Sequence, residues 1–162
     1  MINNNNNNIN SIIFVCLGNI CRSPLAEAIA KEEVKKKNLD IKIASAGTSS
    51  WHIGEAPCIN SQKIALKYNL DISNYKGSQI SQSQLKEFDL IIALDESNYK
   101  DLLRLGADKN KLKKLGCYNN DCLDVPDPYY FSGKDEMQGF DNVFNMIKKS
   151  VIKLLEVSYE ST

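Results

Sequence analysis

Five residues separate Cys16 from Arg22, and Ser23 follows directly, in the stretch VCLGNICRSP that begins at Val15. A cysteine beside a fixed positive charge favours the thiolate, which is the nucleophilic form of the side chain. The guanidinium of arginine is a planar fork that matches two oxygens of a phosphate group. These residue types at this spacing therefore predict attack by a sulfur atom on a bound phosphate.

The residues around this pair are suited to a loop that holds an anion. Gly18 fits a tight turn, and Asn19 tolerates the left-handed backbone conformation. Such a loop can aim successive backbone N–H groups at one point, beside the positive end of a helix dipole. We therefore expect a phosphate-binding loop, made of Leu17, Gly18, Asn19, Ile20, Cys21, Arg22 and Ser23.

The elements that must position the loop alternate between strands and helices. Short β-branched runs predict strands at 12–17, 41–46 and 90–94, and a weaker pattern predicts a fourth at 111–115. Helical patterns lie between them at 25–38, 58–69 and 96–106, with a last one at 140–157. This alternation predicts an α/β fold of three layers, with a four-stranded parallel sheet and helices on both of its faces. The phosphate-binding loop then joins strand 1 to helix 1, at the carboxyl edge of the sheet where ligands bind.

Composition limits the class of protein and its partners. A chain of 162 residues with 43% hydrophobic content predicts one domain at 11–162, after an asparagine-rich tract at 1–10 that we expect to be disordered. Lys+Arg and Asp+Glu balance at 20 each, which gives no reason to expect a nucleic-acid partner. No apolar run is long enough to span a membrane and no secretory signal opens the chain. We expect a cytoplasmic monomer whose thiols are reduced.

Four motifs show which family the chain resembles. They are VCLGNICRSPLAEAI from Val15, SAGT at 45–48, LDESN at 94–98 and VPDPYY at 125–130. In this order and at these separations the chain closely resembles the low-molecular-weight protein tyrosine phosphatases, from residue 12 to the last helix. The resemblance implies hydrolysis of phosphotyrosine in proteins and of small aryl phosphates, as in an acid phosphatase. It implies a phosphocysteine intermediate on Cys16 and requires no metal or other cofactor.

A general acid must protonate the departing phenolate, and three aspartates are candidates: Asp121, Asp124 and Asp127. The sequence does not choose among them. The resemblance implies Asp127, the aspartate of the Asp-Pro pair, as the partner of Cys16 and Arg22 in catalysis. Because this acid must be protonated to act, we expect activity to favour mildly acidic pH.

The resemblance also implies supporting residues. Asn19 holds the shape of the loop with Ser45 among its partners, Asp95 braces the site, and Ser23 donates a hydrogen bond to Cys16. Cys21 is expected to capture oxidised Cys16 as a disulfide that protects it from irreversible oxidation. No role is assigned to Cys58, Cys117 or Cys122.

Substrate recognition is expected from aromatic residues. By resemblance Trp51 lies on the wall of the crevice, and Tyr129 and Tyr130 stack against the phosphotyrosine ring; phosphorylation of these tyrosines is a hypothesis. Ile20 stands where relatives that resemble phosphoarginine phosphatases tend to carry threonine, which favours tyrosine substrates. His52, the single histidine, is expected to be a solvated loop residue. The expected partners are phosphotyrosine proteins, with inorganic phosphate and other oxyanions as inhibitors at the loop.

Two other functions fit part of the pattern. A thioredoxin-linked arsenate reductase shares the cysteine–arginine loop but needs a cysteine pair after the third strand, where this chain has Ala93, Leu94 and Asp95. A catalytically silent phosphate-binding module has no use for the acid Asp127. Binding without turnover would identify such a module.

Overall fold

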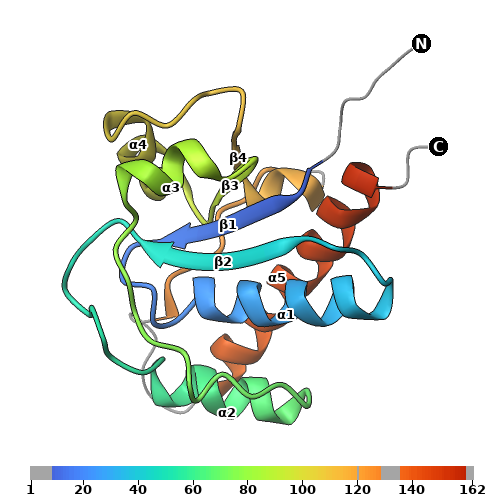
Figure 1. The fold of residues 1–162 in the computed structure, drawn as a ribbon. Helices are drawn as coiled ribbons and strands as arrows, with labels where there is room; N and C mark the ends of the chain where they lie inside the picture. Colours follow the sequence, from blue (N-terminus) through green and yellow to red (C-terminus); the bar gives the residue numbers. More distant parts are fainter. Residues whose placement is uncertain (1–8, 120, 129–135, 160–162) are drawn as a thin grey trace.

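Four parallel strands form the central sheet in the order β2-β1-β3-β4, as Figure 1 shows. The computed structural model describes residues 9–119, 121–128 and 136–159. The strands are β1 (Ser11–Cys16), β2 (Lys42–Gly47), β3 (Leu90–Ala93) and β4 (Leu112–Lys114). Each bound lies within one residue of the strand expected from the sequence. The predicted α/β fold with a four-stranded parallel sheet is confirmed.

Helices cover both faces of this sheet (Figure 1). On one face lie α1 (Ser23–Lys36), α2 (Ile59–Lys67) and α5 (Glu136–Tyr159). On the other lie α3 (Gln82–Glu87) and α4 (Glu96–Arg104), and a short 3-10 helix, η1 (Leu115–Asn119), follows β4. Within the described ranges no helix is both long and apolar enough to cross a membrane.

Strand β1 divides the hydrophobic core into two layers. Ile12 and Phe14 pack on the side of α1 and α5, whereas Ile13 and Val15 pack on the side of α3 and α4. All six residues of β1 are buried, because the strand pairs with β2 and β3 and has helices above and below it. The last residue of this buried strand is Cys16, so the core fixes the position of its thiol.

Helix α3 was not predicted. It has six residues, too few to display a clear hydrophobic period. Its local signal is a capping box, in which the Ser81 side chain accepts from the Gln84 backbone and the Gln84 side chain accepts from the Ser81 backbone.

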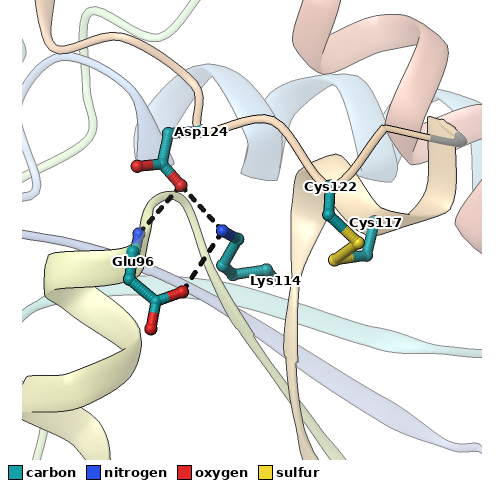
Figure 2. Close-up of a disulfide and its surroundings, with 5 residues drawn as sticks. All are labelled: Glu96, Lys114, Cys117, Cys122 and Asp124. Atoms are coloured by element: carbon teal, nitrogen blue, oxygen red, sulfur yellow. Dashed lines mark hydrogen bonds and ion pairs between the residues drawn. A yellow bond between two sulfur atoms is a disulfide. The ribbon is translucent and has the colours of Figure 1, made fainter.

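The expectation that all the thiols are reduced is wrong for one pair. Cys117 and Cys122 form a disulfide, shown in Figure 2. The chain reverses after η1, and Cys122 adopts a left-handed conformation with φ of 52°. This reversal brings Cys122 back beside Cys117, a proximity that sequence spacing alone does not reveal. The other three cysteines, Cys16, Cys21 and Cys58, are free.

Candidate active site

The loop between β1 and α1 places its cysteine at the carboxyl edge of the sheet. Cys16 ends β1, and α1 begins at Ser23, so the N-terminal end of that helix lies next to the loop. Ser23 Oγ lies 3.0 Å from Cys16 Sγ, and the Asn19 backbone N–H donates to the same sulfur at 3.2 Å. These contacts hold the sulfur at one point beside the N-terminal end of α1.

Asn19 holds the loop to the neighbouring strand. Its φ is +60°, and its side-chain amide donates to Ser23 Oγ at 2.7 Å and to Ser45 Oγ at 3.0 Å. Its side-chain oxygen accepts from the Ser78 backbone N–H at 2.9 Å. Ser45 in turn donates to Glu27 Oε1 at 2.5 Å. The structure thus brings Asn19, Ser23 and Ser45 together, and it adds Glu27 and Ser78, for which the sequence carries no local signal.

Arg22 is buried and contacts two carboxylates. Its Nη1 donates to Asp95 Oδ2 and to the Val125 carbonyl, each at 2.8 Å, and its Nη2 lies 3.7 Å from Asp127 Oδ2. Burial lowers the pKa of the guanidinium, but Cys16 and the two carboxylates outweigh burial, so the pKa of Arg22 is raised overall. The arginine is therefore charged and held in one orientation, as a clamp on phosphate oxygens requires.

The segment that carries Asp127 is attached to β3 and α4. Val125 donates to the Leu94 carbonyl at 3.0 Å, which continues the edge of β3. Asp124 accepts from the Glu96 backbone N–H at 3.0 Å and pairs with Lys114 Nζ at 2.9 Å, as Figure 2 shows. Asp124 thus anchors the segment, whereas Asp127, three residues further along, faces the loop.

One cavity of about 130 Å³ lies at the loop. It is lined by Cys16, Leu17, Gly18, Ile20, Cys21, Arg22, Trp51, His52 and Asp127. The three expected catalytic side chains therefore share one cavity. Of the three candidate aspartates, Asp127 lines the cavity, Asp124 anchors its segment, and Asp121 is exposed. Because chain distance says little about which aspartate faces the loop, sequence spacing could not separate them.

The aromatic residues expected at the crevice are described in part. Trp51 is 69% exposed and lines the cavity, so it is not a core residue. His52, expected to be solvated, lines the same cavity, and its Nδ1 lies 2.9 Å from Glu55 Oε1. A Cβ at Gly18 would come within 2.9 Å of the His52 ring, so a larger residue there requires that ring to shift. Tyr129 and Tyr130 lie outside the described residues.

Known proteins resemble this chain over most of its length. A family model described as low molecular weight phosphotyrosine protein phosphatase matches residues 11–161. The low molecular weight protein-tyrosine-phosphatase YfkJ of Bacillus subtilis is 40% identical over 151 residues, covering 90% of this chain and 93% of YfkJ. PtpA of Staphylococcus aureus, which carries the same description, is 38% identical over 148 residues, covering 90% of this chain and 91% of PtpA.

Solved structures agree. The crystal structure of YfkJ matches with a TM-score of 0.82 at 38% identity, covering 95% of this chain and 98% of YfkJ. The crystal structure of a Drosophila arginine phosphatase matches with a TM-score of 0.83 at 35% identity, covering 93% of this chain and 98% of that one.

Proposed function

Because the chain belongs to the low-molecular-weight phosphotyrosine protein phosphatase family, we propose that it hydrolyses phosphotyrosine through a phosphocysteine intermediate on Cys16. It is a protein tyrosine phosphatase, and therefore a hydrolase. The observation that carries the proposed mechanism is the meeting of Cys16, Arg22 and Asp127 at one cavity of about 130 Å³.

The first step transfers the phosphoryl group to sulfur. Cys16 Sγ attacks phosphorus, the bond from phosphorus to the tyrosine oxygen breaks, and Asp127 gives its proton to that oxygen. Arg22 and the loop amides bind the equatorial oxygens, where charge develops in the transition state. The contact of 3.7 Å between Arg22 and Asp127 supports this division of work, because the acid and the clamp must reach the same phosphoryl group.

The second step releases phosphate. A water molecule attacks phosphorus on the face opposite to sulfur, Asp127 accepts the proton of that water, and the bond between phosphorus and Cys16 breaks. The departing sulfur leaves as a thiolate, which the hydrogen bonds from Ser23 and Asn19 stabilise. Since Asp127 must start the cycle protonated, activity is proposed to be highest below neutral pH, as in an acid phosphatase.

We propose phosphotyrosine proteins and small aryl phosphates as substrates, in preference to phosphoarginine. The residue after Asn19 is Ile20, whose apolar side chain lines the cavity. An apolar wall suits the ring of phosphotyrosine better than the charged guanidinium of phosphoarginine. Trp51 is proposed to extend this wall, and inorganic phosphate and other oxyanions are proposed to compete at the loop.

The chain also has an expected oligomeric state, cellular location and form of redox control. We propose that the chain acts as a monomer in the cytoplasm, where reducing conditions keep Cys16 available as a nucleophile. We propose, as a redox control, that Cys21 captures the sulfenic acid of Cys16 as a disulfide, with loss of water, when a hydroperoxide oxidises the nucleophile.

The test is hydrolysis of an aryl phosphate and of a phosphotyrosine peptide from pH 4 to 8, without added metal. Wild type is compared with Cys16→Ser and Asp127→Ala. We expect no turnover from Cys16→Ser, a deep loss from Asp127→Ala, and an optimum below neutrality. Acid quenching of wild type during turnover of a phosphorus-labelled substrate is expected to trap label on the peptide that contains Cys16. Phosphate binding without turnover by wild type would instead identify a recognition module.

A further inference from the structure

A second pair of thiols lies at the wall of the phosphate-binding loop. Cys21 Sγ lies 2.8 Å from Cys58 Sγ, although 37 positions separate the two residues. Cys21 belongs to the loop and lines the cavity, and Cys58 directly precedes α2. A disulfide has a sulfur–sulfur distance of about 2.05 Å, so the two atoms need to approach by less than about 1 Å to form one.

The backbone already holds the two cysteines together. The Cys58 N–H donates to the Ile20 carbonyl at 2.9 Å, and Ser61 Oγ donates to the Cys21 carbonyl at 3.0 Å. Ser61 is fully buried, and its hydroxyl also lies 3.1 Å from Cys58 Sγ. The start of α2 is therefore fastened to the loop at both cysteines. Because these contacts already order the two segments, a disulfide between the sulfurs costs little further conformational entropy.

The pKa values of the two thiols are shifted in opposite directions. The hydrogen bond with Cys21 lowers the pKa of Cys58, with a smaller contribution from Ser61, although burial acts in the opposite direction. The same hydrogen bond, together with burial and the nearby charges of Cys58 and Cys16, raises the pKa of Cys21. The lowered pKa favours the thiolate form at Cys58, a difference that suits oxidation at this residue.

Cys16 is engaged differently. Its sulfur contacts Ser23 and the Asn19 backbone, whereas the sulfur of Cys21 contacts that of Cys58. A thiol reacts first with the partner that it already touches, because little rearrangement precedes the reaction. The geometry therefore favours Cys58 over Cys16 as the partner of Cys21.

We propose that Cys21 and Cys58 form a reversible disulfide when the protein meets a hydroperoxide. The Cys58 thiolate attacks one peroxide oxygen, the O–O bond breaks, and Cys58 becomes a sulfenic acid with release of hydroxide. The sulfur of Cys21 then attacks the sulfur of Cys58, the S–O bond breaks, and water leaves with the Cys21 proton. In total, two thiols lose two electrons and one hydrogen peroxide becomes two waters.

This disulfide affects the redox control of the phosphatase, a consequence that rests on the proposed function. Once bonded to Cys58, Cys21 is no longer available to capture oxidised Cys16. The Cys21–Cys58 bond therefore competes with the Cys16–Cys21 bond proposed above, and it leaves Cys16 without a disulfide partner in the loop. Under mild oxidation, Cys21 and Cys58 are therefore oxidised before the nucleophile Cys16.

The experiment maps thiols in the full chain after treatment with one equivalent of hydrogen peroxide. Remaining thiols are alkylated, and the protein is digested with trypsin without reductant. Cys16 and Cys21 precede the first tryptic site, Arg22, and so share one peptide, whereas Cys58 lies in the peptide that ends at Lys63. Fragment ions must therefore show which of the first two carries the alkyl group.

The expected main product links Cys21 to Cys58, with the alkyl group on Cys16, and dithiothreitol reverses the link. A main product that links Cys16 to Cys21, or one in which Cys21 and Cys58 are both alkylated, overturns the proposal. This readout needs no turnover. Hydrolysis of an aryl phosphate before oxidation reports separately on the proposed function.

Two variants serve as controls. Cys58→Ser is expected to retain aryl phosphate hydrolysis, which shows that it folds, and to lose the linked peptide. The double variant Cys117→Ser and Cys122→Ser removes the other cysteine pair and is expected to form the Cys21–Cys58 link as wild type does. Loss of the link in the double variant contradicts the assignment, since the bond would then depend on Cys117 and Cys122.

Discussion

Arg22 donates a hydrogen bond of 2.8 Å to the carboxylate of Asp95, whose other oxygen accepts from the Asn98 backbone N–H at 2.7 Å. One carboxylate thus orients the buried guanidinium of the loop and caps the N-terminus of α4. The loop after β1 and the edge after β3 are joined through this residue, so the position of the Arg22 guanidinium depends on a second strand of the sheet.

Asp95→Ala is expected to destabilise the fold and to slow turnover. Loss of the helix cap costs about 1 kcal/mol, and removal of one partner from a buried charge pair adds about 3 kcal/mol at most here, where Asp95 is partly exposed. The matched variant Asp95→Asn keeps one oxygen, which can accept from the Asn98 N–H and preserve the cap, but it turns an amide NH2 toward Arg22. It is expected to retain the stability that the cap contributes. Urea denaturation with kcat measurements checks this. Equal loss of stability in the two variants would contradict the role of Asp95 as both the cap of α4 and the partner of Arg22.

Asn19 is expected to respond differently to glycine and to alanine. Both changes remove the side-chain bonds to Ser23, Ser45 and Ser78, but only glycine adopts the φ of +60° without cost. Asn19→Ala is therefore expected to be less stable than Asn19→Gly by about 1 kcal/mol. Both variants are expected to lose turnover, because the loop loses its brace. Thermal unfolding of the two variants side by side provides the measurement. An alanine variant as stable as the glycine variant would contradict a cost of the left-handed conformation at position 19.

Asp127→Asn is expected to lower kcat for a phosphotyrosine peptide by roughly 100-fold or more, the usual contribution of a general acid. The loss is expected to be much smaller for an aryl phosphate whose phenol is strongly acidic, since that phenolate leaves without a proton. Asp121→Asn, which changes an exposed aspartate of the same segment, is the matched control and is expected to behave as wild type. A loss that is the same for both substrates would remove Asp127 from the role of acid.

Asp124→Ala is expected to loosen the segment that carries the acid. The change removes the acceptor for the Glu96 N–H and the ion pair with Lys114 seen in Figure 2. We expect kcat to fall by roughly 3- to 10-fold, the equivalent of about 1 kcal/mol in the barrier. Lys114→Ala removes the ion pairs with Asp124 and Glu96 but leaves the bond from the Glu96 N–H to Asp124, so its effect is expected to be smaller. Steady-state kinetics of the two variants provides the measurement. A larger loss of kcat in Lys114→Ala than in Asp124→Ala contradicts the anchoring role of Asp124.

Cys58 is expected to react with iodoacetamide at a lower pH than an ordinary cysteine. Its hydrogen bond with Cys21 lowers the pKa, so the reactive thiolate is present below the usual range near 8.5. In Cys21→Ala that hydrogen bond is absent, the pKa rises, and the alkylation profile moves to higher pH. Alkylation rates from pH 5 to 9, followed by peptide mapping, check the direction. If Cys21→Ala leaves the pH dependence of Cys58 alkylation unchanged, the hydrogen bond with Cys21 does not lower the pKa of Cys58.

The amino-acid sequence determined the strands, the phosphate-binding loop and the family. β-Branched runs predicted β1 and β3 because a buried parallel strand needs apolar side chains on both faces, whereas the edge strand β4 has the sequence LKK and a weaker pattern. The spacing of Cys16 and Arg22 predicted phosphate chemistry because both side chains lie within one short loop. Helix α3 escaped prediction because its signal is a local cap and not a hydrophobic period.

Only the tertiary structure decided which distant residues meet that loop. Asp127 and Asp124 are three residues apart, and one lines the cavity while the other anchors to α4 and β4. Cys58 contacts Cys21, and Cys117 bonds to Cys122, although no spacing rule pairs these cysteines. Local periodicity reflects the face of one element, whereas such contacts depend on how strands and helices pack against one another. That packing is a property of the whole chain.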